Sequence, residues 1–175
     1  GPLRACYHGV GHGITDGSDS RSWGNAQAMI EPALALCENF GNTEFKKDLC
    51  ASGVFNSLAI MYGDTRYRLE PKKDDPYQIC SLQEKPYFKK PCYEEMNTLV
   101  MNIMGGDFHR AAMAVLKIEE QNYRVYAIRS LSTYNGAIAF RKDAHKNFIH
   151  SCRALGSDLR NPCIEGFVGG LFEFG

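Results

Sequence analysis

The chain has 175 residues, of which 44% are hydrophobic and 23% are charged, a composition typical of a folded protein with its own core. Its 20 basic and 20 acidic side chains give a formal net charge of zero. This balance leaves no basic footprint for nucleic acid or for an anionic membrane surface. No run of about 18 apolar residues occurs, so the sequence predicts no membrane-spanning segment.

The first two residues, Gly1-Pro2, resemble the remnant of a cleaved purification tag. We therefore interpret residues 1–175 as a single domain excised from a longer protein. On this interpretation, the lack of a secretory leader in the sequence carries no information about localisation.

Six of the seven cysteines form three pairs of similar spacing, with 12, 11 and 10 residues between partners. The pairs are Cys37–Cys50, Cys80–Cys92 and Cys152–Cys163. Zinc sites and cytosolic thiol sites typically use Cys-x-x-Cys pairs, and none is present. The pattern therefore predicts three disulfides and an extracytoplasmic location, whether secreted, periplasmic or in an organelle lumen. Cys6 is left unpaired.

Helices are predicted on both sides of each cysteine pair. Residues 25–37 contain strong helix formers and place Met29, Ala33 and Leu36 on one face, with Pro32 expected to kink the helix or to mark its start. Residues 148–152 end a comparable helix. Polar connections follow the first cysteine of each pair, over residues 38–49, 81–91 and 153–162.

The second cysteine of each pair is predicted to open the next helix. Pro91 and Pro162 stand directly before Cys92 and Cys163, and proline is common at the first position of a helix. Each disulfide would then join the end of one helix to the start of the next and fasten a helical hairpin.

Residues 118–140 are the least regular part of the sequence. Residues 123–129 alternate as a strand would, whereas Thr133-Tyr-Asn-Gly136 matches the start of a helical unit that has lost its cysteines. Weighing both patterns, we predict an all-α fold.

The predicted architecture is a stack of disulfide-linked helical hairpins of roughly 42–44 residues each. This arrangement is similar to an α-solenoid and could curve toward an α/α toroid. The expected units cover about residues 6–49, 50–91, 92–162 and 163–175 onward.

Small residues recur at four-residue spacing after the cysteines that open helices. They occupy one helix face and should allow a neighbouring helix to approach closely, which would offset the helix instability that glycine causes. The three pairs are Gly9 and Gly13, Gly53 and Ser57, and Gly166 and Gly170.

His8 and His12 are the strongest candidates for chemistry, because residues four apart project from one face of a helix. This is the spacing of a two-histidine metal site, and imidazole suits zinc, copper and iron, including haem iron. Asp16 continues the same face and could add an oxygen ligand, and His109 could complete the set if the fold brings it near. A structural or solvent-facing role for both histidines is the alternative.

The positions equivalent to His8 and His12 in the other units are mostly polar. They are predicted to line a shared cleft, where the two glutamates could serve as ligands or general bases. These residues are Ser52, Asn56, Glu94 and Glu165.

The segment Cys6-Tyr-His8-Gly9 is similar to the Cys-His-Gly zinc segment of the lanthionine cyclases, which are α/α toroids. The likeness covers only these few residues, and the paired cysteines have no part in that zinc site. It implies a toroidal enzyme as one alternative.

Three functions are consistent with these features. The first is binding of a transition metal or haem through the His-x3-His face. The second is a scaffold that binds a protein or peptide partner. The third is a toroidal hydrolase or lyase that uses His8 and His12 with a glutamate, although no nucleophile motif accompanies them. The sequence leaves open whether the protein is an enzyme.

Overall fold

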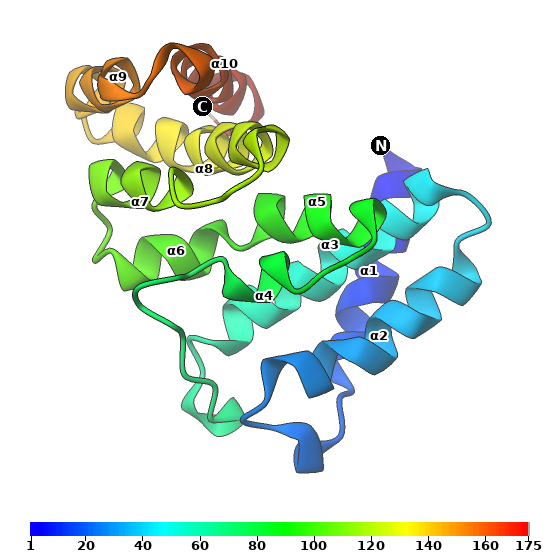
Figure 1. Ribbon diagram of the computed structural model, residues 1–175. Helices are drawn as coiled ribbons and strands as arrows, with labels where there is room; N and C mark the ends of the chain where they lie inside the picture. Colours follow the sequence, from blue (N-terminus) through cyan, green and yellow to red (C-terminus); the bar gives the residue numbers. More distant parts are fainter. Residues whose placement is uncertain (175) are drawn as a thin grey trace. The chain divides into compact units, whose positions relative to one another are not determined.

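The structure is a computed structural model that describes residues 1–174 (Figure 1), and no strand occurs in that range. The helices are α1 (Pro2–Asp16), η1 (Ser20–Ser22), α2 (Ala26–Phe40), α3 (Glu44–Met61), η2 (Thr65–Tyr67), α4 (Gln78–Ser81), α5 (Pro86–Glu95), α6 (Asn97–Ile103), α7 (Phe108–Val115), α8 (Gln121–Arg141), α9 (His145–Ala154) and α10 (Ser157–Phe174). The predicted all-α class is confirmed.

The chain divides into two compact units. The first unit is Gly1–Leu99 and the second begins at Val100, so the junction lies within α6. The solenoid-like stack is not confirmed by this arrangement, and the boundaries expected for its repeats stay a prediction.

All three predicted disulfides form, with Cα–Cα distances of 5.6, 5.4 and 5.6 Å. They join α2 to α3, α4 to α5, and α9 to α10. Their six sulfur-bearing residues are fully buried, whereas Cys6 is free and exposed. Three disulfides are typical of proteins that mature in an oxidising compartment.

The helices that carry the second cysteine of each pair, α3, α5 and α10, begin earlier than predicted. Pro91 and Pro162 lie inside α5 and α10, and each second cysteine lies in the second turn of its helix. Thr43 starts α3 instead, because its hydroxyl accepts a hydrogen bond from the Lys46 amide. The predicted connections were therefore too long, because α5 begins at Pro86 rather than after Pro91, and α10 begins at Ser157 rather than after Pro162.

Two other local predictions were wrong. Leu36 is 42% exposed, and the buried face of α2 runs instead through Met29, Ile30, Ala33, Leu34 and Cys37. Residues 133–136 do not open a helix but lie inside the continuous helix α8, which also contains the alternating residues 123–129, as the all-α prediction requires.

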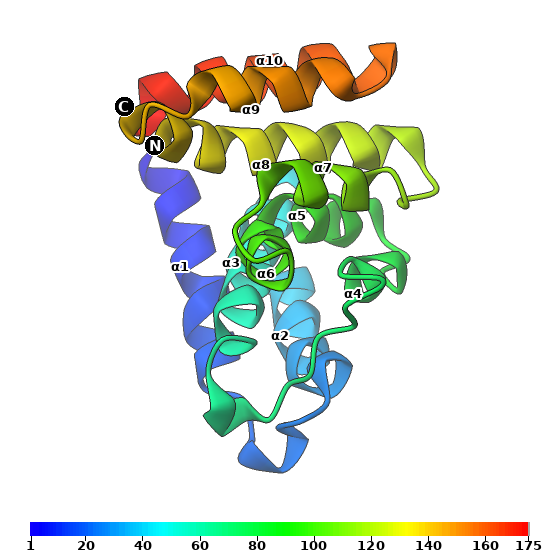
Figure 2. The same cartoon turned by 90° about the vertical axis from the view of Figure 1, so that its left-hand side faces the viewer.

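Helix α3 is the centre of the first unit and contacts both α1 and α5 (Figures 1 and 2). Most of its circumference is buried, including Val54, Phe55 and Leu58, which are completely inaccessible. In the second unit α8 and α10 lie side by side along most of their length (Figure 2). Burying such apolar faces supplies the main stabilisation of a helical domain.

Glycines set the closest helix contacts. A Cβ on Gly53 of α3 would lie 1.9 Å from the His8 carbonyl oxygen of α1, and one on Gly11 would lie 2.0 Å from the Cys50 carbonyl oxygen. Gly166 and Gly170 of α10 meet the backbone of α8 in the same way. The close approach predicted for Gly53, Gly166 and Gly170 is confirmed.

Gly9 and Gly13 were wrongly assigned to such a contact. Both are exposed, and nothing lies within 4 Å of a Cβ at either position. Gly11 takes this role because it lies on nearly the opposite side of α1 from the two predicted glycines, and α1 turns that side toward α3.

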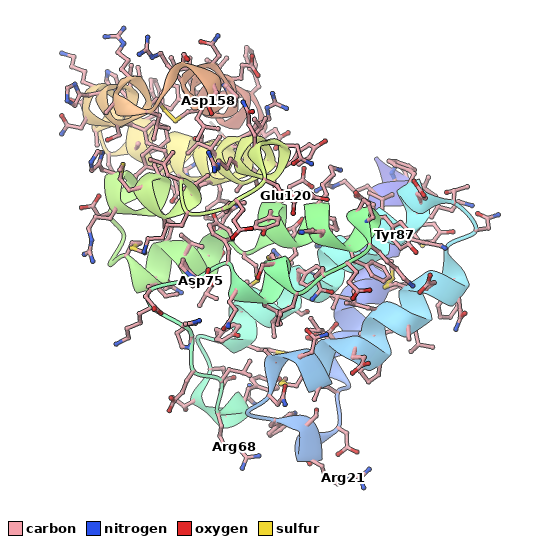
Figure 3. All side chains as sticks on the ribbon, viewed as in Figure 1. Arg21, Arg68, Asp75, Tyr87, Glu120 and Asp158 are labelled. Carbon is pink, nitrogen blue, oxygen red and sulfur yellow. A yellow bond between two sulfur atoms is a disulfide. The ribbon has the colours of Figure 1, made fainter. Side chains whose placement is uncertain are left out.

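Within the described residues, no helix combines the length and apolarity needed to cross a membrane. Charged side chains project from the loops that carry the 3-10 helices, as Arg21 and Arg68 illustrate (Figure 3).

Candidate functional site

His8 and His12 lie on the face of α1 that meets α3, and their rings contact each other. The two Nε2 atoms are 3.1 Å apart, the ring centroids are 4.8 Å apart, and the ring planes meet at 62°. Both side chains are half-buried. The close helix approach at Gly11 and Gly53 brings α3 against this face, so two imidazoles and two hydroxyls meet at one place.

Serines of α3 hold the opposite nitrogen of each ring. Ser52 Oγ lies 2.6 Å from His8 Nδ1, and Ser57 Oγ lies 2.5 Å from His12 Nδ1. Ser57 also donates to Asp16 Oδ1 at 3.0 Å. The result is one continuous hydrogen-bonded row, which we call the His–Ser row: Ser52, His8, His12, Ser57 and Asp16.

The carboxylate at the end of this row determines the tautomer of His12. The single hydroxyl proton of Ser57 is donated to Asp16, so its oxygen must accept the Nδ1 proton of His12. A neutral His12 then carries a lone pair at Nε2, directed at His8. Either a proton on His8 Nε2 or a cation between the rings can interact with this lone pair.

Burial also affects the charge of His8. Desolvation lowers its pKa, and the neighbouring charges of His12 and Arg4 lower the pKa further. His8 is therefore held toward its neutral form, the form that donates a lone pair to a metal.

Glu95 of α5 lies at the other end of the His–Ser row. Its carboxylate accepts a hydrogen bond from Asn56 Nδ2 at 3.1 Å, interacts with the Ser52 hydroxyl and lies 3.9 Å from the Arg4 guanidinium. Burial nevertheless dominates and raises the pKa of Glu95 to about 7. Glu95 was not predicted from the sequence, which pointed to the adjacent Glu94.

This pKa predicts how stability depends on pH. The folded protein holds the Glu95 proton more tightly than the unfolded chain, whose glutamate pKa is near 4.5. The stabilisation of the folded protein by Glu95 is fully present below pH 4.5 and is lost as the pH rises to about 7. Relative to a Glu95→Gln variant, the native protein should lose roughly 3 kcal/mol of unfolding free energy over this window.

Urea unfolding at several pH values measures this difference. Glu31→Gln, which alters an exposed glutamate of α2, serves as the control and should leave the profile of the native protein unchanged. If the unfolding free energies of the native protein and of Glu95→Gln changed with pH in parallel, the pKa of Glu95 would be the same in the folded and unfolded chains, and the prediction would be wrong.

The other residues predicted for the site are dispersed. Asn56 bonds to Glu95 rather than to a histidine, Glu94 pairs with Lys90, and Glu165 pairs with Arg129 in the second unit. His109 is also in the second unit. Within residues 1–174, no group of three or more His, Cys, Asp or Glu side chains is arranged to hold a metal ion.

A cavity of about 310 Å³ opens beside the His–Ser row. His12, Asp16 and Ser57 line one side of it, and the segment around η2 lines the other with Asp64, Arg66 and Tyr67 among its residues. The guanidinium of Arg66 is held by Asp64. A small molecule in this cavity, here called the His12 cavity, would contact the imidazole of His12 directly.

Comparison of the chain with protein-family models, with curated proteins and with solved structures finds no match. The function must therefore be argued from the site itself.

Proposed function

We propose that the first unit binds a divalent transition-metal ion through the Nε2 atoms of His8 and His12. The observation that carries this proposal is the 3.1 Å separation of these two nitrogens, each on a ring whose other nitrogen is held by a serine. The metal-binding unit belongs to a disulfide-linked helical domain that functions outside the cytoplasm.

The nitrogen separation favours chelation of one ion by adjacent coordination positions. With Zn–N bonds of about 2.0–2.1 Å, two nitrogens of a tetrahedral site lie roughly 3.3 Å apart. Two axial ligands of a haem instead lie on opposite sides of the iron, roughly 4 Å apart by the same bond lengths. A zinc or copper ion therefore suits the pair better than haem does.

Ser52 and Ser57 hydrogen-bond to the Nδ1 atoms of the two histidines, which are the ring nitrogens that would not bind the metal. Metal-binding histidines typically hydrogen-bond through their other nitrogen to a group that fixes the ring and its tautomer. Ser57 does this for His12 and donates its hydroxyl hydrogen bond to Asp16. Ser52 does it for His8, and it can turn its proton to Glu95 when His8 donates from Nδ1.

Two protein ligands leave the remaining coordination positions for water or for a bound molecule. The His12 cavity is the space from which such a molecule would reach the metal. Open positions are typical of metal sites that bind or transform a ligand, whereas structural zinc sites are closed by four protein ligands.

The contacts of the serines also resemble the nucleophile–base pairs of hydrolases, but their burial argues against that function. Ser52 is 3% exposed and Ser57 is 2% exposed. A nucleophilic hydroxyl must reach a substrate carbonyl. The Ser52 hydroxyl instead faces His8, and the Ser57 hydroxyl, although Ser57 lines the His12 cavity, is held by both His12 and Asp16. We therefore prefer metal binding to the predicted hydrolase or lyase.

Calorimetric titration of the metal-free chain with Zn²⁺ and Cu²⁺ tests the proposal. One ion should bind, and His8→Ala or His12→Ala should each weaken binding at least 100-fold. Ser52→Ala and Ser57→Ala should weaken it about 10- to 100-fold, because the rings lose their orienting partners. Electron paramagnetic resonance of the Cu²⁺ form should show two nitrogen ligands.

Substitution of the three remaining histidines, His109, His145 and His150, is the matched control and should leave the affinity unchanged. Equal binding by native protein and by the His8→Ala/His12→Ala double variant would overturn the proposal.

A further inference from the structure

A second cavity, of about 360 Å³, lies within the second unit and is lined mainly by residues of α7, α8 and α9. These helices are labelled in Figure 1. We call it the α8 cavity. Its size falls in the range of small-molecule sites, roughly 300–1,000 Å³. It shares no residue with the His–Ser row, and the proposed metal site makes no use of it.

The wall of the α8 cavity is aromatic on one side. Phe108 and Phe148 stack with their ring centroids 3.8 Å apart and their planes at 24°, and Phe148 is buried. Across from α9, Ile138 and Ala139 line the cavity from α8. The small side chains of Ala139 and Ala144 leave the space open. A flat apolar ring would bury its faces here.

Asn135 supplies a hydrogen-bond acceptor to this cavity. Its side chain is 9% exposed, and Nδ2 donates to the Leu131 carbonyl at 2.8 Å. A carbonyl can only accept, so the amide nitrogen must face Leu131 and the side-chain oxygen must face away from it. This oxygen accepts no hydrogen bond from residues 1–174, and it stays accessible in the cavity that Asn135 lines, where a donor from a ligand can replace water. A ligand with an N–H group would satisfy it.

Lys142 supplies an unpaired positive charge at the mouth of the cavity. It is exposed and has no ion pair among the described residues. The nearby carboxylate of Asp107 is already used to cap α7 through the Arg110 amide. Lys142 directly follows the last residue of α8 and comes seven residues after Asn135, about two helical turns or roughly 10 Å along the helix axis. A ring with a short carboxylate chain, met by the flexible lysine, covers this span.

We propose that the α8 cavity binds a small aromatic carboxylate whose ring carries an N–H group. The ring lies against Phe108 and Phe148, the N–H donates to Asn135 Oδ1, and the carboxylate pairs with Lys142. Three chemically different contacts therefore define the ligand class.

Calorimetry on the full 175-residue chain with three related probes tests this assignment. Indole-3-propionate has the ring, the N–H and the carboxylate. 3-(1-Naphthyl)propionate lacks the N–H, and indole-3-propanol lacks the charge. We expect saturable binding of indole-3-propionate, with at least tenfold weaker binding of each of the other two.

Two variants assign the binding to the α8 cavity. Lys142→Ala should weaken indole-3-propionate at least tenfold and leave indole-3-propanol unchanged, whereas Lys146→Ala, a nearby exposed lysine outside the cavity, should change neither. Ala139→Leu should fill the cavity and abolish binding, with circular dichroism confirming the fold. No saturable binding of indole-3-propionate, or equal binding by Lys142→Ala and native protein, would refute the proposal.

Discussion

Gly11→Ala and Gly53→Ala are each expected to lower the unfolding free energy of the first unit by about 2–3 kcal/mol, although alanine is the better helix former. The reason is the α1–α3 contact, where each new methyl group would meet a backbone carbonyl of the other helix at 2.0 or 1.9 Å. A backbone carbonyl cannot rotate away as a side chain can, so the helices must separate.

The same substitution at two neighbouring positions of α1 should have the opposite effect. Gly9→Ala and Gly13→Ala meet no atom within 4 Å and should raise the unfolding free energy by up to about 1 kcal/mol each. Urea unfolding followed by the fluorescence of Trp23, the single tryptophan, reports on the first unit. A uniform stabilisation at all four positions would contradict the close contact.

Gly53→Ala also links the fold to the proposed function. Separation of α1 from α3 would draw Ser52 away from His8, so metal affinity should fall together with stability. Gly13→Ala should keep the affinity of the native protein.

Removal of the disulfide in the second unit is the other change expected to have a large effect. Cys152→Ala with Cys163→Ala should lower the unfolding free energy of this unit by about 3 kcal/mol, from the loop-closure entropy of the unfolded chain. Both residues are fully buried, and no second bridge is present in the described part of this unit. The loss should therefore be a large share of its stability.

Hydrogen exchange resolved along the sequence measures this effect, because it separates residues 100–174 from the first unit. Cys6→Ala removes an exposed free cysteine and should change the unfolding free energy by less than about 0.5 kcal/mol. Unchanged protection of α8 and α10 in the double variant would show that the bridge adds little.

The sequence by itself determined the disulfides and the helical class. Cysteines 11–13 positions apart lie within reach of each other once two helices are joined by a short connection, so their pairing needed no knowledge of the fold. The four-residue spacing of His8 and His12 likewise placed both imidazoles on one helix face. These are local properties, set by the pitch of a helix and the length of a loop.

The tertiary structure alone decided which groups meet across helices. Successive residues of a helix point about 100° apart, so Gly11 lies on nearly the opposite side of α1 from Gly9 and Gly13, and Gly11 rather than either of them meets α3. The 100° step between adjacent residues of α5 likewise explains why Glu95, and not the predicted Glu94, lies at the end of the His–Ser row. The serines that hold the imidazoles lie more than 40 residues away in the chain, and only the α1–α3 contact brings them there. The long helix α8 also depends on its neighbours, since its alternating segment forms a helix by packing against α10.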